Sequence, residues 1–535
     1  MRRAKRVLLY LALLGGVAAA AAVNVRPGAE TLLPCAEAHR PAATYPDYQD
    51  IVIPPDLAPL NLKVLENGRK FCLRLSAGAG ASVELFSSDG KMQIPAGPWR
   101  RLLKANSAGE LRMDFFAKGE RGWLHFDTVR NRIAADEIDP YVVYRYIPAI
   151  YNHWDQISLR QRDLRNFDER ILFDNQRSFD REGRSAGSTC INCHTFLNHG
   201  TNTMLLHVRP SQPPQVPAMI LVRDGRAEKV DTRDGPAAPA AYISWHPSGK
   251  LLAFSRNRLA QVFHTAGTET REVVDRDSDL SLYRLDTGQV FTVPQISRPD
   301  RLETFPAWSP DGRYLYFSAT QSWSGQANAP LHYQEIQYDL DRVSYDIATD
   351  RWGAVDTVVA AASLGKSISL PRISPDGLSL MFCGHDYGSF PIYQPGSDLY
   401  IVDLSRIPAV PRRLDEINSD RTDSYHSWSA NSRWIIFASK REDGMFARLY
   451  ITHLEAGGRF SKPFIMPQED PEFYGRCLMT YNRPELITEP VTVSAAELTR
   501  AMNSTASRPP GAAAPPTGGS PALADSPWQP LRQNR

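Results

Sequence analysis

The sequence is poor in cysteine and carries almost no net charge. Six cysteines in 535 residues exclude a small scaffold held together by disulfides. The 61 Lys and Arg side chains are balanced by 59 Asp and Glu side chains. A net charge of +2 gives no electrostatic reason to expect a nucleic-acid partner. The cysteines are Cys35, Cys72, Cys190, Cys193, Cys383 and Cys477.

Long apolar runs are lacking except at the N-terminus. Residues 1–6 carry four basic side chains, and residues 7–25 are uncharged and mainly apolar. This pattern predicts a secretory signal peptide or a retained N-terminal anchor over residues 1–25. The basic residues favour a cytoplasmic start, so we expect an exported, periplasmic protein that is either free or anchored to the inner membrane.

Short strands are expected in the N-terminal part of the chain. Runs such as Lys70–Leu75 and Leu111–Phe116 alternate apolar and polar residues and are separated by turn residues. We therefore predict a β-sandwich-like domain over residues 45–150. Cys35 and Cys72 either form a disulfide at its edge or remain two thiols.

Four similar strings recur between residues 201 and 490. Each has a turn of the Pro-Asp-Gly type that leads into an alternating strand. Repeats of this kind cannot bury their faces alone, and radial closure into a propeller leaves only short edges. The strings are Ser244–Ser255, Ala307–Ser318, Arg372–Cys383 and Ser427–Ala438.

These strings resemble the W-S-P-D-G-x-x-I-x-F core of the TolB-type repeat. The resemblance covers residues 201–490 and implies a TolB-like β-propeller with five or six blades. The predicted fold class is therefore mainly β. Residues 151–200, dense in Arg, Asp and Gln, are expected to connect the two β domains. Residues 491–535 are rich in Pro, Ala and Gly and are expected to be disordered.

The segment Cys190-Ile-Asn-Cys193-His194 fits C-x-x-C-H, the attachment motif of a c-type haem. The two thiols add to the two vinyl groups of the porphyrin, and the histidine becomes an iron ligand. A thioredoxin-like pair would need a βαβ pattern, and a zinc site would need further ligands nearby. We therefore expect one covalent haem c, held by Cys190, Cys193 and His194 in the connector.

The second axial position of the iron is left open by the spacing. His207 is the first candidate and Met204 the second. On a strand these two side chains point to opposite faces, so at most one of them would face the haem. His246 and His264 are more distant candidates. An open position would favour chemistry on a small molecule.

The chain also resembles a family of exported bacterial proteins in which C-x-x-C-H lies just before a TolB-like propeller. Matching residues include Asp139–Arg145, Met204–His207 and Tyr481–Glu485. The resemblance spans residues 45–490 and implies a membrane-associated or periplasmic monohaem cytochrome. It implies no particular reaction.

Three functions follow as hypotheses. The first is electron transfer, with the propeller as a docking platform for a redox partner protein. The second is a haem enzyme or sensor that acts on a small molecule at an open axial site. The third is a binding or assembly protein with a structural haem. A serine hydrolase is not expected, because Gly183-Arg-Ser-Ala-Gly187 lacks the strand–turn–helix context of a nucleophile elbow.

Overall fold

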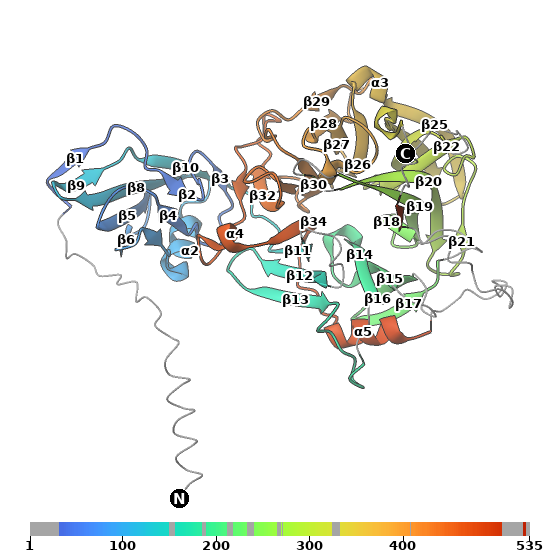
Figure 1. The fold of residues 1–535 in the computed structure, drawn as a ribbon, viewed down its shortest axis with the longest axis horizontal. Coiled ribbons are helices and arrows are strands. Elements are labelled where there is room, and N and C mark those ends of the chain that lie inside the picture. The colour runs from blue at the N-terminus through green and yellow to red at the C-terminus, as the bar shows by residue number, and fades with distance from the viewer. Residues whose placement is uncertain are drawn as a thin grey trace, which may run out of the picture. The chain divides into compact units, whose positions relative to one another are not determined.

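The computed structural model is mainly β and divides into two compact units (Figure 1). The predicted signal or anchor over residues 1–25 lies outside the described residues. In the part that is described, no helix is long and apolar enough to cross a membrane. The described residues are 32–148, 156–184, 189–210, 218–232, 240–264, 269, 271–323, 332–406, 408–505 and 528–530.

The first unit comprises residues up to 135 together with 467–476. It has a seven-stranded sheet and a three-stranded sheet. The seven strands are β1 (Cys35–Glu37), β3 (Val52–Ile53), β5 (Lys70–Ala77), β6 (Val83–Ser87), β8 (Glu110–Gly119), β9 (Gly122–His125) and β10 (Val129–Ile133). The three strands are β2 (Thr44–Tyr45), β4 (Leu62–Val64) and β7 (Lys91–Met92). The helices are α2 (Ala96–Ala105) and α4 (Phe473–Arg476).

Helix α2 contributes to the core of this unit. It buries Trp99, Leu102 and Leu103, whose spacing places them on one helical face. The Trp99 indole donates a hydrogen bond of 2.8 Å to the carbonyl of Leu57. The polar end of a large apolar side chain is thereby satisfied.

The possible disulfide in this unit is not formed. Cys35 and Cys72 are both free thiols. Strands β8 and β9 stand between β1, which carries Cys35, and β5, which carries Cys72. Three strand spacings of about 4.8 Å exceed the separation of about 7 Å that a disulfide allows between its Cα atoms.

The second unit is built from six antiparallel sheets, called blades 1 to 6 below. Each is a four-stranded meander from the axis outwards, and β35 (Trp528–Pro530) adds to blade 3. Blade 1 has β34 (Met479–Ile487), β11 (Tyr141–Pro148), β12 (Ser158–Asp163) and β13 (Glu169–Asp174). Blade 2 has β14 (Thr189–Phe196), β15 (Thr203–Pro210), β16 (Ala218–Arg223) and β17 (Arg226–Val230). Blade 3 has β18 (Ala240–Trp245), β19 (Leu251–Phe263), β20 (Arg271–Arg284) and β21 (Val290–Phe291).

The other three blades have the same order of strands. Blade 4 has β22 (Arg301–Trp308), β23 (Tyr314–Gln321), β24 (Asp339–Asp346) and β25 (Arg351–Val359). Blade 5 has β26 (Ser367–Ile373), β27 (Ser379–His385), β28 (Asp398–Asp403) and β29 (Pro411–Arg413). Blade 6 has β30 (Asp423–Trp428), β31 (Trp434–Ser439), β32 (Arg448–His453) and β33 (Phe464–Ile465). Short helices η2 (Leu197–His199), η4 (Tyr333–Glu335), α3 (Ala361–Leu364) and η5 (Pro391–Tyr393) lie in the connections.

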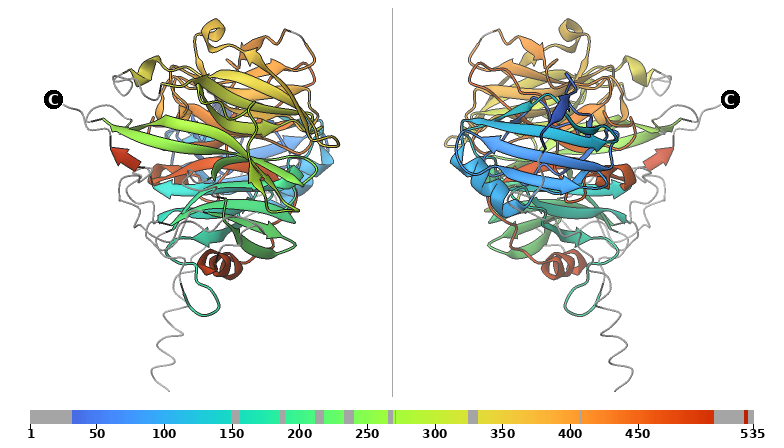
Figure 2. Two further views of the ribbon diagram at one scale, coloured as in Figure 1. Left: turned by 90° about the vertical axis from the view of Figure 1, so that its right-hand side faces the viewer. Right: turned by 90° about the vertical axis from the view of Figure 1, so that its left-hand side faces the viewer.

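The six blades close into a ring, as Figures 1 and 2 show. The innermost strands contact one another in the order β14, β18, β22, β26, β30 and β34, and β34 contacts β14 again. Strand β34, from the C-terminal part of the unit, pairs antiparallel with β11 from its N-terminal part. The unit is therefore a six-bladed β-propeller closed by joining distant segments, which confirms the predicted propeller.

The predicted turns open the second strand of their blades. In blade 4, the Ser309 hydroxyl donates to Asp311 at 2.6 Å, and Gly312 adopts a φ of +72°. In the degenerate fourth copy, Ser432 takes the position of the glycine with a φ of +60°. Ser432 therefore adopts the same left-handed backbone as the glycine it replaces, and the two copies share one turn geometry.

The prediction of a connector over residues 151–200 is wrong. Its described residues form β12 and β13 of blade 1 and β14 of blade 2, so the propeller starts at β11 rather than at residue 201. The N-terminal domain accordingly ends near residue 135 instead of 150. The sequence of these strands shows no clear alternation of apolar and polar residues, because many of their side chains are charged. Such side chains pair across the strands, as Arg160 and Glu169 do at 2.5 Å.

The expected disorder of residues 491–535 is also partly wrong. Residues Ala495–Asn503 form helix α5, whose N-cap Ser494 accepts a hydrogen bond from the backbone of Glu497. Leu498 and Met502 pack into the core between blades 1 and 2. The Pro- and Gly-rich stretch 506–527 lies outside the described residues.

Two buried histidines make the propeller sensitive to acid. Burial lowers the pKa of His385 to about 4, and burial together with the nearby charge of Arg372 lowers that of His426 to about 3. In the unfolded chain both titrate near pH 6.5. The unfolded state therefore binds protons first, and the stability present above about pH 6.5 is lost as the pH falls. We expect each histidine to lower the free energy of unfolding by about 1.4 kcal/mol per pH unit between about pH 6 and pH 4.

Urea denaturation at a series of pH values measures this slope. His385→Gln should reduce the slope by the share of one histidine, because a neutral amide takes up no proton. His332→Gln is the matched control, since His332 is exposed. An unchanged slope in His385→Gln would contradict the assignment.

Candidate functional site

The innermost strand of every blade contains a β-bulge at the same place. Two residues of the innermost strand stand opposite one residue of its neighbour in all six sheets. In five of them the first bulge residue is a non-glycine residue with a left-handed φ between +46° and +55°. For a non-glycine residue, this backbone conformation costs on the order of 1–3 kcal/mol of conformational free energy. Residues strained in this way cluster at functional sites. These residues are Tyr242, Phe305, Leu370, Tyr425 and Arg483.

The bulges direct side chains toward the propeller axis. The rings of Tyr242 and Phe305 lie 4.4 Å apart, although they belong to different blades. The Arg483 guanidinium lies 5.6 Å from the centre of the Tyr242 ring and donates to the Cys193 sulfur at 3.3 Å. Blades 1, 2, 3 and 4 thus meet through these side chains. The propeller axis is therefore the place where reactive and charged side chains from several blades lie close together.

The whole of the predicted haem motif, Cys190 to His194, lies on β14, the innermost strand of blade 2. The side chains of Cys193 and His194 are buried, whereas that of Cys190 lies outside the described ones. His194 is 1% exposed, and its Nε2 lies 3.3 Å from the carbonyl oxygen of Val143. Its Nδ1 has no hydrogen-bond partner among the described residues.

The environment keeps His194 neutral. Burial lowers its pKa to about 3, and the positive charges of Arg483, Arg145 and Arg372 contribute to that shift. A neutral imidazole with a free nitrogen is the form that binds a metal. The histidine is therefore in the right state to act as an iron ligand.

A small cavity opens beside these residues. Its volume is about 10 Å³, which is room for about one water molecule and far below the range of about 300–1,000 Å³ that is usual for small-molecule sites. The walls come from β26, β30 and β34, three innermost strands. The lining residues are Leu370, Arg372, Tyr425, His426, Arg483, Pro484 and Glu485.

The donor set fits a c-type haem, while the free space is limited. A buried thiol and a neutral histidine are the groups that such a haem uses. Because the cavity has room for about one water molecule, a macrocycle there would require lining side chains such as Arg483 and Tyr425 to move. No group of three His, Cys, Asp or Glu side chains suited to a bare metal ion occurs in the described part of the chain.

The two proposed second ligands lie on the strand that pairs with the one carrying His194, on either side of Leu206, which stands opposite His194. Both lie on β15, the second strand of blade 2, and both are fully buried. Met204 packs with Phe196 in the core between blades 1 and 2. His207 alternates with Leu206 and so points to the opposite face, toward blade 3.

The more distant histidine candidates are engaged elsewhere. His246 lies in the turn after β18, where its ring nitrogens contact Ser248 at 2.8 Å and Gly312 at 3.1 Å. His264 forms an ion pair of 3.1 Å with Glu272. Neither lines the axial cavity.

The sequence interpretation missed the residues that line the axis. A signal for four of them existed, because each lies three positions before the Trp or Ile that opens a repeat: Tyr242, Phe305, Leu370 and Tyr425. The same spacing places His426 one residue later. Arg145 and Arg483 had no such signal, since they belong to strands outside the four copies.

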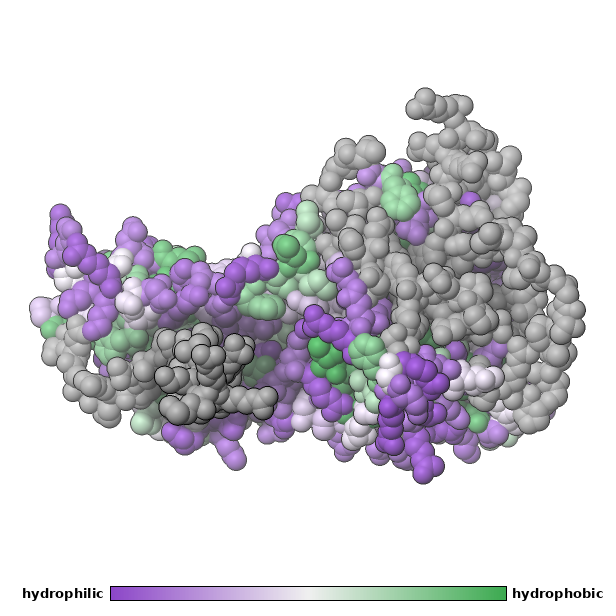
Figure 3. Space-filling view, turned by 60° about the horizontal axis from the view of Figure 1, so that its bottom comes forward, coloured by the Kyte–Doolittle hydropathy of each residue, from purple (hydrophilic) through white to green (hydrophobic). Residues whose placement is uncertain are grey.

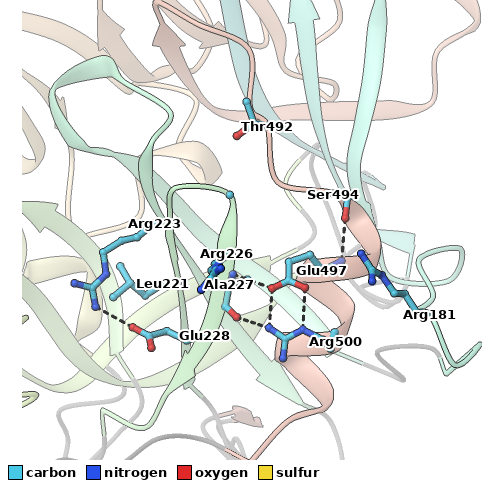
Figure 4. Close-up of a pocket in the computed structure, with 11 residues that line it drawn as sticks. Arg181, Leu221, Arg223, Arg226, Ala227, Glu228, Thr492, Ser494, Glu497 and Arg500 are labelled. Carbon is cyan, nitrogen blue, oxygen red and sulfur yellow. Dashed lines mark hydrogen bonds and ion pairs between the residues drawn. The ribbon is translucent and has the colours of Figure 1, made fainter.

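A second cavity lies on the outside of blade 2, next to α5 (Figure 4). Arginines are prominent in its lining, but two of them are neutralised within it. Arg223 pairs with Glu228 at 3.0 Å and Arg500 pairs with Glu497 at 2.7 Å. The helix and the blade are joined through Ala227, whose backbone N–H donates to Glu497 at 3.1 Å and whose carbonyl accepts from Arg500 at 2.7 Å.

Comparisons with known proteins give distant structural resemblances. Neither protein-family models nor curated proteins match the chain. Among solved structures, a chain of a nidogen/laminin complex aligns with a TM-score of 0.36 and 8% identity, over 65% of this chain and 99% of that one. A DUF4784 family protein from Bacteroides caccae gives 0.30 and 9%, over 82% and 98%. A prolyl endopeptidase gives 0.30 and 11%, over 61% and 42%. At these values the resemblances assign neither a family nor a function.

Glu485 is the carboxylate that links the cavity to β14. It accepts hydrogen bonds from the backbone of Phe196 at 2.9 Å and from the Thr195 hydroxyl at 3.3 Å. Glu485→Gln should lower the free energy of unfolding by about 1–3 kcal/mol, because the amide keeps an acceptor oxygen but removes the negative charge that acts on the buried Arg372 and Arg483. Chemical denaturation measures the change, with the exposed Glu335→Gln as control. Equal stability of the two variants would contradict this role.

Proposed function

We propose that the chain is an exported, periplasmic c-type monohaem protein that transfers electrons. One haem c would be attached through Cys190 and Cys193, with His194 as an iron ligand. The observation that carries the proposal is the state of His194, which is buried, neutral and free at Nδ1 beside a buried thiol. When bound, the haem supplies an iron that accepts and releases one electron.

The chain's own residues would set the electrostatics of this site. Arg483 donates a hydrogen bond to the Cys193 sulfur. The guanidiniums of Arg145 and Arg372 also act on His194 through their charge. Positive charge and burial around the iron favour its reduced state, so we expect a raised reduction potential.

The TolB-like propeller would then serve as the docking platform for a redox partner. The loops that connect its strands would determine which partner binds, because rigid blades hold them in place. On the face in Figure 3, the described residues are mostly hydrophilic, with small separate hydrophobic spots. Such a surface suits a transient partner better than a permanent one.

A second candidate is a haem enzyme or sensor with an open axial position. The observation that favours it is that Met204 packs in the apolar core between blades 1 and 2, whereas His207 faces blade 3. The third hypothesis, a binding or assembly protein with a structural haem, would show no redox activity. The coordination of the iron distinguishes these functions.

Covalent attachment is tested by removing each thiol. In a host that attaches haem c, the wild-type chain should carry haem that stays on the polypeptide in a denaturing gel. Cys193→Ala and Cys190→Ala should each leave at most one thioether and change the absorption spectrum of the reduced haem. Cys35→Ala is the control, because Cys35 lies in the other unit. A haem-free wild-type chain would refute the proposal.

The spectrum of the reduced, haem-loaded protein separates electron transfer from small-molecule chemistry. Electron transfer predicts a six-coordinate, low-spin iron that does not bind carbon monoxide. Loss of that spectrum in only one of His207→Ala and Met204→Ala would identify the second ligand. A five-coordinate iron that binds carbon monoxide would refute simple electron transfer and support the enzyme or sensor.

A further inference from the structure

The cavity on the outside of blade 2 has room for a small molecule. Its volume is about 690 Å³, which lies within the range of about 300–1,000 Å³ that is usual for such sites. It is open to solvent, and its walls come from β16, β17, the turn after β13 and the start of helix α5 (Figure 4). Its described lining shares no residue with the axial cavity.

The side chains that line this cavity carry an excess of positive charge. Four arginines and two glutamates contribute to the lining, which leaves two positive charges more than negative ones. A concave surface with charges of one sign in excess focuses their field and raises the local concentration of counter-ions. The six residues are Arg181, Arg223, Arg226, Arg500, Glu228 and Glu497.

Both glutamates are already bound to other groups. Glu228 pairs with Arg223 at 3.0 Å. The Glu497 carboxylate accepts two hydrogen bonds from Arg500, at 2.7 and 2.8 Å, and one from the backbone N–H of Ala227 at 3.1 Å. These contacts occupy the two carboxylates and neutralise two of the four arginines.

Arg181 and Arg226 are the two arginines that remain. Among the described residues, neither side chain forms a hydrogen bond or an ion pair of 4.0 Å or less. Arg181 comes from the turn after β13 and Arg226 from β17, and in the view of Figure 4 Glu497 lies between them. Because both line one cavity, a single ligand there can contact both guanidiniums.

We propose that this cavity binds a small organic dianion, either a phosphate ester or a dicarboxylate, through Arg181 and Arg226. The planar fork of a guanidinium matches two oxygens of a phosphate or a carboxylate group. The two positive charges in excess match the charge of such a ligand. Leu221 and Ala227 provide apolar lining for its carbon atoms, and the Thr492 hydroxyl provides a further hydrogen-bond donor.

This binding does not depend on the proposed haem. Strand β14, which carries the haem motif, is the innermost strand of blade 2, whereas β17 is the outermost. A chain without haem would therefore keep the cavity. In the same way, a chain that fails to bind a dianion would leave the haem proposal untouched.

Isothermal titration of the full-length chain tests the proposal in a buffer that contains neither phosphate nor carboxylates. The probes are glycerol phosphate and succinate, which are both dianions at about pH 8, with the monoanion acetate for comparison. We expect saturable binding of one dianion per chain and binding of acetate that is weaker by about tenfold or more. Arg181→Gln and Arg226→Gln should each weaken dianion binding by about tenfold or more, because each removes a charge-assisted contact. Arg177→Gln is the matched control, because Arg177 is exposed and close in sequence to Arg181 but does not line the cavity.

The outcomes decide both the site and the class of ligand. If both arginine variants weaken the binding of one probe, that probe gives the class of dianion that the cavity prefers. Arg226→Lys keeps the charge without the planar fork and should lose only a few-fold in affinity, which tests the site even if a glutamine variant fails to fold. Absence of saturable binding of both probes, or equal affinities of the two glutamine variants and the wild-type chain, overturns the proposal.

Discussion

The pairing of β34 with β11 is the interaction on which the rest of the propeller depends. It joins residues more than 330 positions apart in the chain, such as Arg145 and Asn482. Without it, blade 1 would lack its innermost strand and the ring would stay open. Closure also brings Arg483 and Glu485 to the axis beside Cys193 and His194. The candidate site therefore exists only in the closed ring.

The shared bulge is the second constraint. A bulge turns the innermost strand locally and gives its first residue a left-handed backbone. At five positions this residue is aromatic, aliphatic or arginine, although glycine would adopt the same backbone without strain. The side chains that glycine would lack are the ones that fill the axis. Strain at these positions is thus the cost of placing Tyr242, Tyr425 and Arg483 there.

Burial and charge together prepare the candidate haem site. Burial lowers the pKa of His194, and the positive charges of Arg483, Arg145 and Arg372 add to that effect. The imidazole is therefore neutral, which is the form that binds iron.

The sequence by itself determined the β class, the propeller repeats and the C-x-x-C-H motif, because these depend on local alternation, turn residues and fixed spacing. Only the tertiary structure decided that β12, β13 and β14 belong to blades. Their charged side chains pair across strands and so conceal the period of two. It also decided that Cys193 lies beside Arg483, since 290 residues separate them and only ring closure brings them together. It also decided that the residues around Leu498 form helix α5, because the apolar face of that helix covers the core between blades 1 and 2. Local patterns encode strands and turns, whereas the axial site arises from contacts that no local pattern contains.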